Sequence, residues 1–123
     1  MSKLKFNGLY YYLNISLYIN YILRFFEKNN LVIGVSLSAN KGKELFKNYF
    51  PQGDWFNEFY EKNGNYTIFG NKISFVCGKV SYEGTILDSE KLSLFSHSYI
   101  NGHESTNEYK YISFNDINKL RVD

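Results

Sequence analysis

Apolar and polar residues alternate with a period of two along most of the chain. Between Leu9 and Phe25 every odd position is apolar or aromatic, whereas Asn14, Asn20 and Arg24 stand at even positions. Successive side chains on a β-strand point to opposite faces, so this pattern indicates strands with their odd positions toward a core. A break near residues 14–16 predicts two strands, with Tyr11 and Tyr21 inside and with Tyr10 and Tyr12 on the outer side.

The loop after Phe26 determines which way Arg24 points. A loop of three residues, 27–29, with Asn29 in the left-handed conformation, places Leu23 on the same face as Ile33 and turns Arg24 outward. A loop of even length would turn Arg24 toward the aliphatic side chains instead. We favour the first register because it keeps every inward position apolar.

Residues 65–98 predict a series of tight hairpins. Gly70-Asn71 and Gly78-Lys79 are suited to two-residue turns. The first turn would place Ile68 opposite Ile73, and the second would place Phe75 opposite Tyr82 and Cys77 opposite Val80. An odd-length loop within "LDSEK" would align Ile86 with Leu92. The last strand, at about 108–114, is expected to pair with 92–98.

Residues 38–65 depart from the period of two. Their apolar residues recur at helical spacing on either side of Pro51 and Gly53. We therefore expect two short helices at about 42–61, the second capped by Asp54 and carrying Trp55. A final helical turn is expected in "SFNDINKLRVD", with Asn115 or Asp116 as its cap.

These elements predict an all-β fold. We expect an antiparallel meander of about eight strands that closes into a barrel, with the helices at about 42–61 inserted, as one domain over 1–123. Closure removes the exposed sheet edges, and an eight-stranded barrel has room inside for side chains or for one small ligand.

Several segments resemble small bacterial lipocalin-like proteins of mostly unassigned function. They are "LRFFEKNNLVIGVS", "WFN", "GNYTIFGNKISF", "VSYEGTIL" and "LSLFSHSYINGHESTNEYKYISF", which together span roughly residues 21–114. Such proteins often contain "RFY-x-DG-x-V", "G-x-Y-x-I-x-G-N-x-I-x-F" and "Y-x-G-x-I". The resemblance implies a lipocalin-like barrel, and its strand-and-turn motifs imply little about function.

Composition and charge exclude several classes of protein. The 123 residues are 44% hydrophobic and 20% aromatic, which is too apolar for a disordered chain. The net charge is +2 with no basic block, so we expect no nucleic-acid partner. Asn7, Asn14 and Asn20 interrupt the apolar N-terminal run. We therefore expect neither a signal peptide nor a membrane span, and a cytoplasmic location.

The segment "SHSYINGHE" holds both histidines, and its chemistry has two interpretations. Ser96 and His97 could suggest nucleophilic catalysis, but neighbours on one strand point to opposite faces. A metal site at His97 and His103 would need further ligands, and only Glu104 is near in sequence. We therefore expect a hairpin loop turning at Asn101-Gly102, no cofactor and no metal.

The inward aromatic residues, with Tyr109 among them, have two interpretations as well: a filled core, or a cavity whose phenol groups orient a guest. We expect a non-enzymatic protein that binds a small, mainly apolar molecule in the barrel. The predicted ligand-binding residues are Tyr11, Tyr21, Phe25, Trp55, Tyr66, Phe75, Tyr82 and Tyr111. The alternative is a protein-interaction module, of an inhibitor or immunity type, that uses the aromatic helical insert around Trp55. Cys77 is the only cysteine and is expected to be buried.

Overall fold

The computed structural model describes residues 3–17, 19–38 and 63–121 of the chain. The two helices expected at about 42–61, with Asp54 and Trp55, lie outside these residues. No helix in the described ranges has the length and apolar character needed to cross a membrane.

The described chain forms nine antiparallel strands and one α-helix. The elements in chain order are β1 Gly8–Asn14, β2 Ile19–Phe25, the short 3-10 helix η1 Lys28–Asn30, β3 Leu31–Ser38, β4 Asn63–Asn65, β5 Thr67–Phe69, β6 Lys72–Cys77, β7 Val80–Asp88, β8 Lys91–Ser98, β9 Glu104–Ser113 and α2 Phe114–Arg121. Their order in the sheet is β4-β3-β2-β1-β9-β8-β7-β6-β5. The all-β meander is therefore confirmed, with nine strands where about eight were expected.

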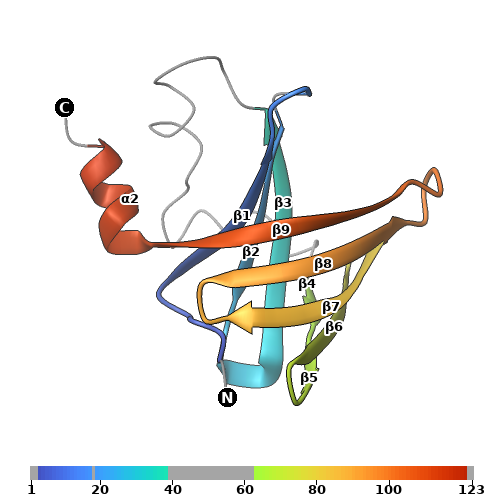
Figure 1. Ribbon diagram of the computed structural model, residues 1–123, viewed down its shortest axis with the longest axis horizontal. Helices are drawn as coiled ribbons and strands as arrows, with labels where there is room; N and C mark the ends of the chain where they lie inside the picture. Colours follow the sequence, from blue (N-terminus) through green and yellow to red (C-terminus); the bar gives the residue numbers. More distant parts are fainter. Residues whose placement is uncertain (1–2, 18, 39–62, 122–123) are drawn as a thin grey trace.

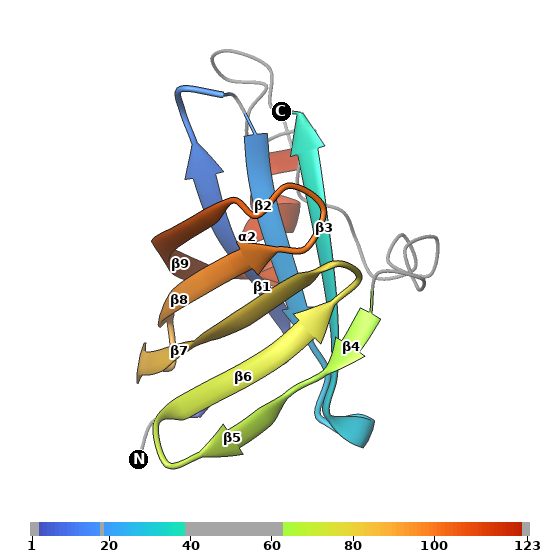
Figure 2. The same cartoon turned by 90° about the vertical axis from the view of Figure 1, so that its right-hand side faces the viewer.

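The strands wind into a nearly closed barrel. In Figure 1, β1, β2 and β3 run upright while β7, β8 and β9 cross them at a steep angle. The turned view shows β6 to β9 winding across the upright strands (Figure 2). Pairing of β1 with β9, such as Leu9 opposite Ile112, joins the first strand to the last. Most contacts along the sheet are local hairpins, and this pairing is the long-range step that shapes the barrel.

The two edge strands of the sheet are β4 and β5. The gap between the two edges of the sheet, here called the seam, is narrowed where β4 lies against β6. A Cβ atom on Gly64 would overlap the carbonyl oxygen of Val76, so only glycine allows the two backbones to lie this close. The segment is held to the loop after β2 by the Tyr66 amide, which donates to the Asn30 carbonyl at 2.8 Å, and by the Tyr66 hydroxyl, which donates to the Phe26 carbonyl at 2.9 Å. This end of the barrel is therefore closed.

The predicted hairpins of β5 to β8 are confirmed. Ile68 lies opposite Ile73, and Phe75 lies opposite Tyr82. Ile86 lies opposite Leu92, as expected. Gly70 and Gly78 adopt φ values of 63° and 58° in the two short turns, a conformation that glycine adopts without steric cost.

The register predicted for β2 and β3 is wrong. Arg24 lies opposite Ile33, and Leu23 lies opposite Gly34. The connecting loop has even length because Asn29 and Asn30 both take positive φ, 61° and 49°, where only Asn29 was expected to do so. Arg24 therefore shares a face with aliphatic residues, and its guanidinium lies 4.5 Å from the Phe26 ring centre and 4.7 Å from that of Phe114.

This register is tolerated because β1, β2 and β3 are buried on both faces. One cluster fills the barrel, around Tyr10, Leu23 and Phe25. A second cluster lies outside the barrel beneath α2; its buried members are Leu9, Ile22, Ile33, Val35 and Ile117. The expected directions on β1 are therefore reversed: Tyr10 and Tyr12 face the interior, and Tyr11 packs on the outer cluster.

The expected C-terminal helical turn is confirmed as α2, which stands outside the barrel beyond the end of β9 (Figure 1). Its cap differs from the prediction. The Ser113 hydroxyl accepts a hydrogen bond from the Asp116 amide at 3.0 Å, so Ser113 caps the helix rather than Asn115 or Asp116. The cap aligns α2 so that Ile117 is fully buried in the outer cluster.

Candidate functional site: a tyrosine-lined pocket at the mouth of the barrel

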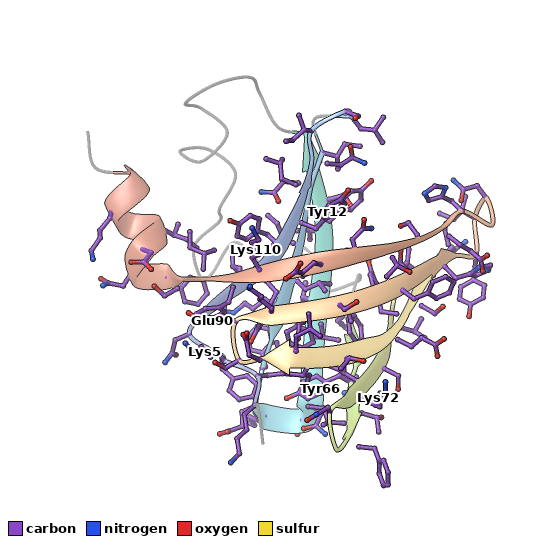
Figure 3. All side chains as sticks on the ribbon, viewed as in Figure 1. Lys5, Tyr12, Tyr66, Lys72, Glu90 and Lys110 are labelled. Carbon is purple, nitrogen blue, oxygen red and sulfur yellow. The ribbon has the colours of Figure 1, made fainter. Side chains whose placement is uncertain are left out.

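The inside of the barrel changes from apolar at one end to polar at the other. On β8 the inward residues run from buried Leu92 and Leu94 to Ser96, and Ser96 lies opposite Ser105 of β9. In Figure 3, Tyr66 lies toward one end of the barrel and Tyr12 toward the other. The first end is closed by the core cluster, whereas the described residues of the second end surround a hollow, and this end is here called the mouth.

A pocket of about 320 Å³, here called the mouth pocket, occupies the polar end. Its volume lies at the lower end of the range usual for small-molecule sites. The lining residues are Tyr12, Asn14, Leu17, Tyr21, Ser36, Val80, Tyr82, Ser96, Ser98, Asn101, His103, Ser105, Asn107 and Tyr109. None of these described residues is Asp, Glu, Lys or Arg, so hydroxyl and amide groups supply most of the polarity.

Four tyrosines from four different strands contribute to this pocket. Tyr12 of β1 and Tyr21 of β2 lie directly opposite each other, with ring centres 6.0 Å apart and planes within 11°. Tyr109 of β9 contacts Tyr12 with ring centres 5.9 Å apart. Tyr82 of β7 stacks on Phe75, with ring centres 4.7 Å apart. Aromatic packing therefore continues from the inner cluster into the mouth pocket.

Burial raises the pKa values of the two deepest phenols. The pKa of Tyr109 lies well above its ordinary value, first because the ring is removed from solvent and then because Tyr82, Tyr21 and Tyr12 are close enough to oppose a negative charge. The pKa of Tyr82 is raised too, by burial first and then by Cys77 and Tyr21. These phenols are therefore neutral at physiological pH and can act as hydrogen-bond donors.

A polar wall of the pocket is a short chain of side chains on β8 and β9. The Asn107 amide donates to the Ser105 hydroxyl at 3.0 Å, and the Ser105 and Ser96 hydroxyl oxygens are 3.4 Å apart. These contacts fix the side chains against one another along the wall. The wall therefore offers a surface of hydroxyl and amide groups beside the phenol groups, with Ser96 directly next to Tyr82 on the neighbouring strand.

A second hollow of about 400 Å³, the seam pocket, adjoins the mouth pocket. It lies between Gly34–Ser36 of β3 and Cys77–Val80 at the β6–β7 turn, and Lys79 brings a positive charge to its lining. Tyr21, Ser36, Val80 and Tyr82 border both hollows. The seam pocket therefore widens the space available beside the two tyrosines.

The structure places the predicted ligand-binding residues in three environments. Tyr21 and Tyr82 line the mouth pocket. Phe25, Tyr66, Phe75 and Tyr111 belong to the closed inner cluster. Tyr11 lies on the outer face, where it packs against the second cluster.

Several lining residues were missed by the sequence interpretation. Tyr12 was expected outside, and Ser105 and Asn107 were assigned to a loop because the last strand was expected to begin near 108. β9 begins at Glu104 instead. The alternation of Ser105, Asn107 and Tyr109 at every second position was the available signal that all three share one face.

The predicted hairpin turn at Asn101-Gly102 is confirmed. Gly102 has φ 73°, and its amide donates to the Ser98 carbonyl at 2.8 Å. His97 lies 2.9 Å from the Glu104 carboxylate across the β8–β9 pair, whereas His103 borders the mouth pocket. Among the described residues no three His, Cys, Asp or Glu side chains are grouped so that they could hold a metal ion.

Cys77 is buried, as the sequence predicted. Its thiol lies 3.7 Å from the Val32 carbonyl oxygen, and burial raises the pKa of the thiol to about 12. A thiol held in its protonated form is a poor nucleophile. The geometry therefore favours a packing role for this cysteine.

Comparison with known proteins finds no matching family model, no matching curated protein and no matching solved structure. The resemblance to lipocalin-like proteins thus stays a prediction that rests on strand-and-turn motifs. The arguments on function below rest on the geometry of the mouth pocket.

Proposed function

We propose that this protein binds one small, uncharged, mainly apolar molecule in the mouth pocket, without converting it chemically. The observation that supports this most strongly is the combination of an aromatic floor with a wall of hydroxyl and amide groups at the mouth of the barrel. Ligand sites are commonly concave, mostly apolar and equipped with a few convergent polar groups.

The charges around the pocket support an uncharged ligand. An anion would call for Lys or Arg in the lining and a cation for Asp or Glu, and the described lining of the mouth pocket holds none of these. Binding rather than catalysis is supported by the directions of Ser96 and His97. Ser96 lines the pocket, while His97 is directed toward Glu104 and Tyr99.

The proposal can be tested with N-phenyl-1-naphthylamine, an uncharged probe whose own fluorescence rises in apolar surroundings. We expect saturable binding of one probe to each chain. Ser105→Trp should fill the mouth pocket and abolish binding. Thr106→Trp is the matched control, because Thr106 is the next residue on β9 and is exposed on the outer side.

Circular dichroism should show that both variants keep the fold. Equal binding by Ser105→Trp and Thr106→Trp would place the probe elsewhere and refute the proposal.

A second candidate function, protein interaction, is favoured by one observation on the outer surface of β5 to β8. Phe69 is 87% exposed and Phe95 is 36% exposed, and both border one shallow hollow together with Glu83. Exposed apolar residues that cluster in this way often mark contact surfaces. The simplest partner is a second copy of the chain.

Sedimentation velocity over a range of concentrations tests this second candidate. We expect the wild-type chain to self-associate and the double variant Phe69→Ser, Phe95→Ser to remain monomeric. A wild-type chain that stays monomeric at every concentration would rule out self-association through this surface.

A further inference from the structure

We propose that Tyr12, Tyr21, Tyr82 and Tyr109 form a subsite that recognises a carbonyl oxygen of the ligand by donating hydrogen bonds to it. This inference rests on the proposed function, because it assigns a chemical group to the molecule bound in the mouth pocket. It predicts an uncharged ketone, ester or amide on an apolar body. The argument depends on where the four phenols lie and on what their hydroxyl groups contact.

The four phenols meet at one place although they come from separate strands. Tyr12 and Tyr21 face each other across the β1–β2 pair, and Tyr109 contacts Tyr12 from β9. Tyr82 comes from β7 and borders the same pocket. Tyr109 is only 4% exposed, and it is one of the residues that line the mouth pocket.

The hydroxyl groups of these tyrosines differ from those of Tyr10 and Tyr66 at the closed end of the barrel. At the closed end, the Tyr10 hydroxyl donates to the Ser89 carbonyl at 2.6 Å and the Tyr66 hydroxyl donates to the Phe26 carbonyl at 2.9 Å. Among the described residues, no side chain or backbone group forms a hydrogen bond with the hydroxyl of any of the four mouth tyrosines.

These hydroxyls lie in the lining of the mouth pocket, so they are accessible to donate hydrogen bonds to a bound molecule in place of water.

The chemistry of a phenol group selects the class of ligand. Phenol hydroxyls that stay neutral donate hydrogen bonds, and a carbonyl oxygen has two lone pairs that can accept two of them. A carboxylate could accept them too, but the described lining of the mouth pocket holds no Lys or Arg to compensate its charge. Its one basic side chain is His103, and Lys79 lines the adjoining seam pocket. The flat rings meanwhile favour an aromatic or otherwise apolar body next to the carbonyl.

Two naphthalenes of similar shape test this subsite. 2-Acetylnaphthalene carries a carbonyl oxygen, and 2-ethylnaphthalene lacks it. Each would be titrated against bound N-phenyl-1-naphthylamine, and displacement would give its affinity. We expect the acetyl compound to bind about tenfold more tightly, as two neutral hydrogen bonds of ordinary net strength would give.

Phenylalanine variants assign the effect to the tyrosines. Tyr82→Phe and Tyr109→Phe should each lower the preference for the acetyl compound severalfold and leave the affinity for 2-ethylnaphthalene unchanged. Tyr99→Phe is the control, because Tyr99 is 63% exposed and is not among the residues that line the mouth pocket. If Tyr109→Phe fails to fold, Tyr21→Phe replaces it, since Tyr21 is only partly buried.

The possible outcomes separate this inference from the proposed function. Equal affinity for the two naphthalenes, or a preference that persists in every phenylalanine variant, would overturn the carbonyl subsite while ligand binding stands. Tighter binding of 2-naphthyltrimethylammonium than of the acetyl compound would also overturn it, because ring faces would then dominate recognition. Failure of the wild-type chain to bind any of the probes would overturn the proposed function as well.

Discussion

The Tyr10 hydroxyl donates a hydrogen bond of 2.6 Å to the backbone carbonyl of Ser89. This bond joins β1 to the turn between β7 and β8, which lies far along the chain. The same hydroxyl accepts a hydrogen bond from the Lys5 amide at 3.0 Å, and the ring of Tyr10 is fully buried against Phe25. One side chain therefore fastens the N-terminal segment, β1 and a distant turn at the closed end of the barrel.

Tyr10→Phe should lower the free energy of unfolding by about 1–3 kcal/mol, because it removes both hydrogen bonds and leaves the packing of the ring in place. Urea unfolding followed by circular dichroism measures the change. Tyr12→Phe is the matched control on the same strand, because the Tyr12 hydroxyl forms no hydrogen bond with the described residues. Its free energy of unfolding should stay within about 0.5 kcal/mol of that of the wild type. Equal losses in the two variants would argue against the anchoring role of Tyr10.

The protein should lose stability in alkali, because burial raises the pKa of Tyr10 from 10.0 to about 12. A phenol whose folded pKa is raised binds its proton more tightly in the folded state. Its contribution is therefore fully present below the unfolded pKa near 10 and is lost as pH rises through the folded pKa near 12. Burial raises the pKa values of Tyr82 and Tyr109 as well, so the ionisation of these two phenols also lowers the stability of the folded state in alkali.

Urea midpoints measured from pH 8 to pH 12, with phenolate absorbance as a second signal, test this dependence. We expect midpoints that hold up to about pH 10 and then fall. The urea midpoint of Tyr10→Phe should fall less steeply above pH 10 than that of the wild type, because the variant lacks one phenol with a raised pKa. A midpoint unchanged up to pH 12 would contradict the burial of these phenols.

The Cys77 thiol should not react with Ellman's reagent at pH 8 in the folded protein. Burial restricts access to the sulfur, and the raised pKa of about 12 leaves almost no thiolate. Unfolding in urea should expose one reactive thiol in each chain. For a matched control, Ser74→Cys in a Cys77→Ser background moves the thiol to the exposed face of the same strand, where it should react rapidly without urea.

Ser113→Ala should destabilise the protein by about 1 kcal/mol, as the loss of a helix N-cap usually does. The substitution removes the acceptor of the Asp116 amide and loosens the turn that brings Ile117 into the outer cluster. Asn115→Ala is the control, because Asn115 is exposed and does not provide the cap. Thermal unfolding compares the stabilities of the two variants. A larger loss of stability in Asn115→Ala than in Ser113→Ala would contradict the assignment of Ser113 as the cap.

Local sequence determined the hairpins of this protein. Gly70 and Gly78 each take a positive φ in a two-residue turn, and a turn of defined length aligns the strands on either side of it. The pairing of Phe75 with Tyr82 therefore followed from a few neighbouring residues. The segment "SFNDINKLRVD", with Asn115 or Asp116 as its expected cap, likewise indicated a helical turn after the last strand, although Ser113 is the capping residue.

The mouth pocket was predicted only in part. Tyr21 and Tyr82 were expected in the ligand site and line the pocket. Ser105 and Asn107 were not expected there, because polar residues at every second position look the same whether they face solvent or a polar cavity. Which of the two they face depends on strands β1 and β7, which are distant in sequence.

Only the tertiary structure decided the direction of β1. Alternation along β1 and β2 was visible in the sequence, and the inward direction of Tyr21 and Phe25 on β2 was predicted correctly. On β1 the assignment was reversed, since α2 and its residue Ile117 cover the outer face as well. A strand buried on both sides gives no polar face from which its direction can be inferred. Tyr10 therefore lies inside and Tyr11 outside for a physical reason that no local pattern contains: the packing of a helix formed about a hundred residues later in the chain.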